Sequence, residues 1–158
     1  MSKKVNLGKV ILCLAAVFGL AAICMVFVPA VKGTGKLIGT EPVFSGTQVV
    51  FGYKDGDTQI LNFNFLAFLG LFVLPIAATA LTVASFLNGN KTFSFVAAAL
   101  FLVSAILAFL TVASFKSGVV SGTYYDLYTW KLAIGAILSG VFSVVACCAL
   151  AVKEFMKF

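Results

Sequence analysis

The sequence predicts an all-α membrane protein, a four-transmembrane-helix bundle with a small extracellular antiparallel β-hairpin or sheet. Hydrophobic residues make up 62% of the 158 residues and charged residues only 10%, and the mean hydropathy is +1.14. Such a composition is typical of membrane proteins. All charged side chains lie outside four apolar stretches, residues 10–31, 63–87, 93–115 and 132–152. Each stretch has the roughly 20 residues that a helix needs to cross a hydrocarbon core of about 30 Å.

The lysines that flank these stretches predict the orientation of the chain. Lysines concentrate at the cytoplasmic ends of membrane helices. Six lysines lie near the two termini or at residue 91, and five lie in the two longer loops. We therefore expect both termini in the cytoplasm, residues 32–62 and 116–131 outside, and a location in the cell membrane. Residues 1–158 are then one membrane domain in contact with the lipid bilayer. The net charge of +6 is explained by helix anchoring, so nucleic acid is not an expected partner.

Each apolar stretch has its own local pattern. Residues 10–31 hold an apolar core longer than the roughly 7–15 residues of a signal peptide, which predicts a membrane helix. Residues 63–87 include Pro75, which predicts a kink whose freed carbonyls are served by neighbouring groups or hydroxyls. Residues 110–115 repeat the LTVASF of residues 81–86, and a small duplication and convergent packing both explain this. In residues 132–152 small residues that allow close helix packing recur, and the predicted stripe is Gly135, Ser139, Gly140 and Ser143.

The first long loop predicts a two-stranded hairpin. Residues 47–54 and 57–62 are rich in β-branched and aromatic side chains, and Asp55-Gly56 between them is a strong turn signal. Pairing about this turn sets Tyr53 opposite Thr58, Phe51 opposite Ile60 and Val49 opposite Asn62. Alternation along the strands then gives the hairpin an apolar face of Val49, Phe51, Tyr53 and Ile60. An isolated hairpin is marginal in water, so this face is expected to rest on other parts of the chain.

The second long loop, residues 116–131, is the candidate partner of that face. Residues 119–125 are predicted to supply a third strand beside the hairpin. Aromatic side chains gather further along the loop, and we interpret them as a belt at the membrane interface: Tyr124, Tyr125, Tyr128 and Trp130. The hypothesised interaction surface combines both loops, and its residues are Val49, Phe51, Tyr53, Ile60, Tyr124 and Tyr125.

Residues that carry chemistry are scarce. The chain has no histidine and no arginine, and the apolar stretches hold no ionisable acid or lysine. This argues against histidine-based nucleophilic catalysis, histidine-ligated metals and intramembrane proton relays. Asp55 and Asp57 supply too few oxygens for calcium, which takes about six to eight. We therefore expect no catalytic residue, metal or cofactor, and no enzymatic activity.

The layout resembles the claudin and peripheral-myelin-protein type of tetraspan. The shared features are internal termini, a long β-forming first outer loop, a tight inner turn and a shorter second outer loop. The resemblance implies a small sheet above a left-handed four-helix bundle. The first outer loop lacks the tryptophan and the two cysteines of the family signature, so only the architecture carries over.

Three functions are compatible with these patterns as hypotheses. The first is a non-enzymatic assembly or adhesion protein that binds copies of itself or another membrane protein through its outer sheet and small-residue helix faces. The second is an auxiliary subunit of a channel or transporter. The third, with the least support in the sequence, is a protein that handles lipids or small molecules.

Overall fold

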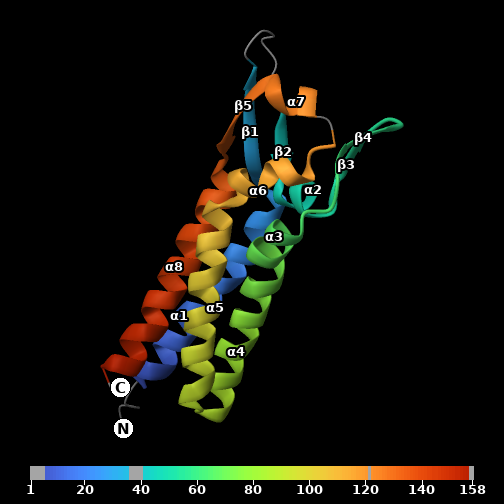
Figure 1. Ribbon diagram of the computed structural model, residues 1–158. Helices are drawn as coiled ribbons and strands as arrows, with labels where there is room; N and C mark the ends of the chain where they lie inside the picture. Colours follow the sequence, from blue (N-terminus) through green and yellow to red (C-terminus); the bar gives the residue numbers. More distant parts are fainter. Residues whose placement is uncertain (1–5, 36–40, 121, 157–158) are drawn as a thin grey trace.

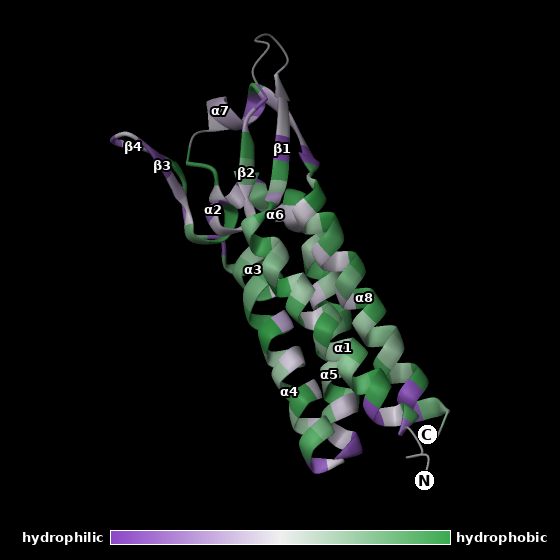
Figure 2. Cartoon of the chain, turned by 180° about the vertical axis from the view of Figure 1, so that it is seen from behind, coloured by the Kyte–Doolittle hydropathy of each residue, from purple (hydrophilic) through white to green (hydrophobic). Residues whose placement is uncertain are grey.

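The computed structural model describes residues 6–35, 41–120 and 122–156. This part of the chain is mostly helical, with small antiparallel sheets at one end (Figure 1). Among the described residues, four helices are long and apolar enough to cross a membrane, and they are Leu7–Phe27, Phe65–Asn88, Lys91–Phe109 and Ile134–Phe155. The shortest has 19 residues and is therefore about 28 Å long. Figure 2 shows that apolar residues cover the four helices and that hydrophilic residues gather at both ends of the bundle.

These helices form a ring. Helix α1 (Leu7–Cys24) packs against α4 (Leu74–Asn88) and α8 (Ile134–Phe155), and α5 (Lys91–Phe109) packs against the same two helices. The start of α1 and the end of α8 lie at the same end of this bundle (Figure 1). We call this the terminal end, formed by residues 6–12, 85–94 and 150–156. The sheets lie at the opposite end, which we call the sheet end and which is formed by residues 29–35, 41–64, 111–120 and 122–133.

The first helix stops earlier than residue 31. Helix α1 (Leu7–Cys24) begins at Asn6, whose side chain accepts a hydrogen bond from the Lys9 amide. A short 3₁₀ turn, η1 (Met25–Phe27), follows, and strand β1 (Pro29–Gly35) begins directly after it. The predicted helix boundary was wrong because proline disfavours helical backbone at the residue before it, so the chain turns extended at Val28.

Pro75 is accommodated by a widened helical turn. The second span consists of α3 (Phe65–Phe68), the π turn η2 (Leu69–Val73) and α4 (Leu74–Asn88). The Leu74 amide donates to the Leu69 carbonyl, five residues back, so it does not reach Gly70. The Gly70 carbonyl instead accepts a 2.8 Å hydrogen bond from the buried Ser104 hydroxyl of α5. The prediction that a neighbouring hydroxyl would donate a hydrogen bond to a freed carbonyl is confirmed.

The third helix also ends before its predicted boundary at residue 115. Helix α5 (Lys91–Phe109) stops at Leu110, whose φ of −87° and ψ of 4° lie outside the helical region, and α6 (Thr111–Gly118) continues at the sheet end. The Thr111 hydroxyl donates to the Ala108 carbonyl over 2.7 Å. This bond competes with the backbone amides that would otherwise continue the helix.

The small-residue stripe of α8 (Ile134–Phe155) faces the inside of the bundle. Gly135, Ser139, Gly140 and Ser143 are all buried. A Cβ added at Gly140 would lie 2.6 Å from the Phe109 ring, and one added at Gly135 would lie 2.6 Å from the Pro29 carbonyl oxygen. The stripe thus permits close contact between segments of the same chain.

Two sheets make up the head of the molecule. The larger has strand order β2-β1-β5, with β2 (Val43–Ser45) and β5 (Tyr128–Leu132) both antiparallel to β1. The smaller is the hairpin of β3 (Tyr53–Asp55) and β4 (Thr58–Leu61). Short helices α2 (Gly46–Phe51) and α7 (Gly122–Asp126) lie between the strands.

The hairpin differs from its prediction in length and register. Residues 46–51 are helical, so the first strand begins only at Tyr53. Asp55 pairs with Thr58 and Tyr53 with Leu61, which moves the turn one residue along the chain to Gly56-Asp57. Gly56 has a positive φ of 58° there, a conformation that glycine adopts without strain. The expected pairs of Tyr53 with Thr58, Phe51 with Ile60 and Val49 with Asn62 are therefore wrong.

The predicted third strand at residues 119–125 is reduced to a single bridge. Leu61 pairs with Val119, and the amides of Asn62 and Val120 donate across this junction to Gly118 and Ile60. The chain then leaves the extended conformation, because α7 begins at Gly122.

Candidate interaction site at the sheet end

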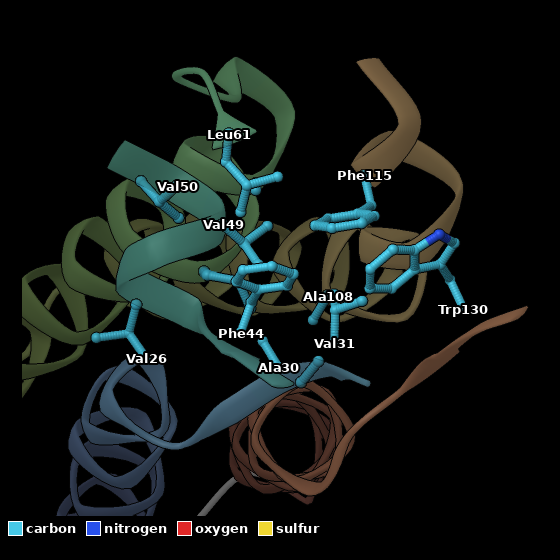
Figure 3. Packing of buried hydrophobic residues seen from close by; sticks show 13 residues of the cluster. Val26, Ala30, Val31, Phe44, Val49, Val50, Leu61, Ala108, Phe115 and Trp130 are labelled. Atoms are coloured by element: carbon cyan, nitrogen blue, oxygen red, sulfur yellow. The ribbon is translucent and has the colours of Figure 1, made fainter. Parts of the chain in front are cut away.

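An aromatic core fixes the head on the helices. Phe44 of β2, Phe115 of α6 and Trp130 of β5 are buried together (Figure 3). The ring centroids of Phe115 and Trp130 are 4.6 Å apart, and those of Phe44 and Phe115 are 5.8 Å apart. The Trp130 indole donates a 2.9 Å hydrogen bond to the Tyr125 carbonyl, so its polar group is satisfied although the ring is buried. The interpretation of Trp130 as an interface belt residue was wrong.

Strand β5 went unnoticed because its aromatic residues also fit a membrane belt. Its burial alternates, with Trp130 buried and the neighbouring Thr129 and Lys131 exposed, and this period of two is the signal that identifies a strand. Gly33 of β1 pairs with Trp130, and a Cβ on Gly33 would lie 2.8 Å from the indole ring. Glycine at this position therefore lets the tryptophan lie flat across the neighbouring strand.

Helix α2 was not predicted either, although its start carries a signature. The Ser45 hydroxyl accepts a hydrogen bond from the Gln48 amide, and the Gln48 side chain accepts one from the Ser45 amide. This Ser-x-x-Gln pattern is a capping box, which stabilises a helix start. Val49 consequently lies in the core, only 2% exposed.

Phe51 contacts aromatic side chains of the second span. Its ring packs edge-on against Phe68 and Phe72, with centroids 6.0 Å and 5.8 Å away. Phe63 joins the same group through Phe68, at 5.3 Å. These rings form a cluster where the head meets the second span, and Phe51 and Phe63 leave it half exposed.

Three of the four remaining predicted residues meet at a cleft between the hairpin and α7. Tyr53, Ile60 and Tyr124 are half-buried and lie on β3, β4 and α7. Two adjoining hollows of about 240 and 270 Å³ share Ile60 and Tyr124 in their walls. Tyr125 does not line either hollow and stacks against Trp130 at 6.1 Å.

Two edge strands border the first of these hollows. Val43 and Phe44 of β2 line it together with Tyr53 and Asp55 of β3, and the rings of Phe44 and Tyr53 are in contact, with centroids 5.7 Å apart. In the described residues each of these strands lies at the edge of its sheet. Edge strands present backbone groups that a further extended chain can pair with.

The cleft is polar but weakly charged. The carboxylate of Asp55 and the amide of Gln48 line it together with the Tyr124 phenol. Burial, followed by the proximity of Tyr128, Tyr53 and Asp55, raises the pKa of Tyr124 above its ordinary value. Its hydroxyl therefore stays protonated at neutral pH and can donate as well as accept a hydrogen bond.

The chemistry available here suits binding. Within residues 6–35, 41–120 and 122–156, no group of three or more histidine, cysteine or acidic side chains is placed to hold a metal ion. The four cysteines Cys13, Cys24, Cys147 and Cys148 are free thiols on the long helices. The cleft combines apolar side chains, a phenol, an amide and a carboxylate, which are the groups that bind a polypeptide segment.

Comparison with protein families, with characterised proteins and with solved structures gave no match to this chain. The structure itself defines the class: a four-helix protein, with helices long and apolar enough to cross a membrane, that carries a small sheet-bearing head at one end.

Proposed function

We propose that this chain is a non-enzymatic, multi-pass membrane protein that binds an extended segment of a partner protein at its sheet end. The observation that carries the proposal is the cleft between the hairpin and α7, which is lined by Tyr53, Ile60 and Tyr124 and whose first hollow is bordered by the edge strands β2 and β3. An added strand gains affinity from backbone hydrogen bonds, and pockets for alternate side chains supply specificity.

The packing of the head supports a recognition role. Strands β1 and β5 continue directly from α1 and into α8, and the Ala133 amide donates to the Ala30 carbonyl at the junction. The aromatic core and the capping box of α2 hold the cleft walls in place before a partner arrives. Such preorganisation lowers the entropy that binding must overcome.

The helix faces contribute less to association than the sequence alone suggests. Because the stripe of Gly135, Ser139, Gly140 and Ser143 packs inside this chain's own bundle, it is not offered to a second protein. Assembly is therefore assigned to the sheet end, with the termini cytoplasmic and the head outside the cell.

Site-specific photocrosslinking tests the proposal. A benzoylphenylalanine at Val43, on the edge of β2, is expected to give one discrete adduct in cells, and the same residue at exposed Thr129 of β5 serves as the matched control. The Ile60→Arg change should abolish the Val43 adduct while the purified protein keeps its circular dichroism spectrum.

The mass of the adduct separates two versions of the function. Twice the mass of the chain indicates self-assembly, whereas a larger foreign protein supports the role of an auxiliary subunit of a channel or transporter. Equal crosslinking from Val43 and Thr129, or an adduct that persists in Ile60→Arg, refutes recognition at the cleft.

A further inference from the structure

A further hollow lies at the terminal end, at the opposite end of the bundle from the cleft. Its volume is about 220 Å³, and its walls come from the start of α1, the turn between α4 and α5, and the last turn of α8. Lysines from three different helices line it: Lys9, Lys91 and Lys153. None of these lysines has a role at the sheet end.

The lysines are positioned by their own contacts. The Lys9 ammonium lies 5.5 Å from the centre of the Phe86 ring, in a cation–π arrangement. The Lys153 side chain is only 13% exposed, and its ammonium contacts the Glu154 carboxylate and lies 3.4 Å from the Ser94 hydroxyl. Ser94 in turn shares a 2.7 Å hydrogen bond with Ser85, which lines the hollow. Hydroxyl groups and ammonium groups therefore meet at one place.

The charge balance of this hollow favours an anion. Three lysines face one acid, Glu154, among the described residues of the terminal end. Helices α1 and α5 begin here and α4 and α8 end here, so their dipoles oppose one another and the lysines decide the sign.

An apolar groove continues from the same hollow. It measures about 110 Å³ and lies between α1 and α4, and it shares Leu12 and Phe86 with the lysine-lined hollow. Cys13 and Val83, which are both exposed, border the groove, and Ala16 and Thr82 complete its lining. A basic hollow that opens into an apolar groove on the side of a membrane-spanning bundle matches the two halves of an anionic phospholipid.

We infer that the terminal end binds an anionic phospholipid, with the lipid phosphate between Lys9, Lys91 and Lys153 and an acyl chain in the groove between α1 and α4. This rests on the proposed placement of the four helices in a membrane, and it is independent of the cleft. The bilayer supplies such lipids on the cytoplasmic face, where basic residues attract them.

Native mass spectrometry of the full chain in a non-ionic detergent tests the inference. Phosphatidylglycerol is expected to bind one tight site, and phosphatidylcholine much more weakly. The double change Lys9→Gln and Lys91→Gln should weaken phosphatidylglycerol binding about 25-fold, since each lysine near a membrane surface is worth about five-fold in affinity. Lys153 is left intact because its loss would strand the buried Glu154 carboxylate.

Two controls separate a specific site from general attraction. The matched change Lys54→Gln and Lys131→Gln removes the same charge at the sheet end and should leave binding unchanged. Ala16→Leu fills the groove and should weaken lipid binding several-fold, whereas Ala99→Leu on an exposed face of α5 should not.

Three results would overturn the assignment. The first is equal retention of the two lipids, and the second is an equal loss of binding in both lysine double variants. The third is glycerol phosphate binding as tightly as phosphatidylglycerol with no effect of Ala16→Leu, which would assign the hollow to a soluble phosphate compound and not to a lipid.

Discussion

Replacing Ser104 with alanine is expected to destabilise the bundle through a carbonyl that lies on another helix. The Gly70 carbonyl cannot accept from Leu74, whose amide donates to Leu69. The residue five positions on is Pro75, which has no amide hydrogen. The 2.8 Å bond from Ser104, which is fully buried, is thus the hydrogen bond that serves this carbonyl.

The cost arises from leaving that carbonyl without a partner. A buried unsatisfied acceptor costs about 1–3 kcal/mol in soluble proteins, while hydrogen bonds between membrane helices average about 0.6 and reach about 1.7 kcal/mol. We expect Ser104→Ala to lower the unfolding free energy by about 1 kcal/mol, measured by dodecyl sulfate titration in mixed micelles. Ser143 is equally buried but has no hydrogen-bond partner among the described residues, so Ser143→Ala should cost much less.

A thermodynamic cycle with Pro75 makes this prediction specific. Pro75→Ala restores an amide hydrogen that can donate to Gly70, so the loss of Ser104 should cost little in that background. The expected coupling energy is therefore close to the whole cost of Ser104→Ala. If Ser104→Ala costs the same with Pro75 and with Ala at position 75, or no more than Ser143→Ala, the reasoning about the orphaned carbonyl fails.

Substitutions elsewhere in the chain are expected to have equally specific effects. Gly135→Ala should lower the thermal midpoint in detergent far more than Gly140→Ala, because a Cβ at Gly135 meets backbone oxygens whereas one at Gly140 meets the partly exposed Phe109 ring, which can rotate. Ser45→Ala removes the capping box and should cost about 1 kcal/mol, with faster hydrogen exchange confined to residues 46–51. Tyr124→Phe should remove a component that ionises above about pH 10 from the absorbance titration at ultraviolet wavelengths. Since the folded-state pKa of Tyr124 is raised, the unfolded chain ionises first and the wild-type head should lose stability as the pH rises through that range. Equal midpoints for the two glycine variants, unchanged exchange in Ser45→Ala, or identical titrations would each contradict the corresponding argument.

The four helices were predictable because their signal is local. Length and apolarity mark a span without reference to any other part of the chain, and all four predicted stretches contain one of the observed helices in large part. The ends were less predictable, because a proline ends the first span and a hydroxyl–carbonyl hydrogen bond accompanies the end of α5. The repeat shows the same limit: Ser85 bonds to Ser94 at the terminal end, while its counterpart Ser114 accepts from Asn64 at the sheet end. The two copies of this six-residue sequence therefore contact different neighbours.

The sheet required information that no single segment contains. Strand β1 contains Gly33 and Gly35, and it becomes a central strand only because β2, from the same loop, and β5, from about 95 residues further along the chain, pair with its two edges. The side chains of residues 46–51 favour a strand, but the capping box of Ser45 and Gln48 starts a helix there. For this reason Tyr53, Ile60 and Tyr124 meet at the cleft, whereas Val49 is buried in the core and Phe51 packs against Phe68.

The pairing of β1 with β5 also determines how the bundle can move. The two strands are bonded in register from Val31 with Leu132 to Gly35 with Tyr128, and they extend α1 and α8 without a flexible linker. A slide by one residue, about 3.4 Å, would turn Trp130 from the core to the opposite face of the sheet. A slide of α1 against α8 by one residue would therefore break this register, and the head resists such a slide in this helix pair. By contrast, α4 and α5 adjoin the π turn and the break at Leu110, and the β1–β5 pairing does not join these two helices.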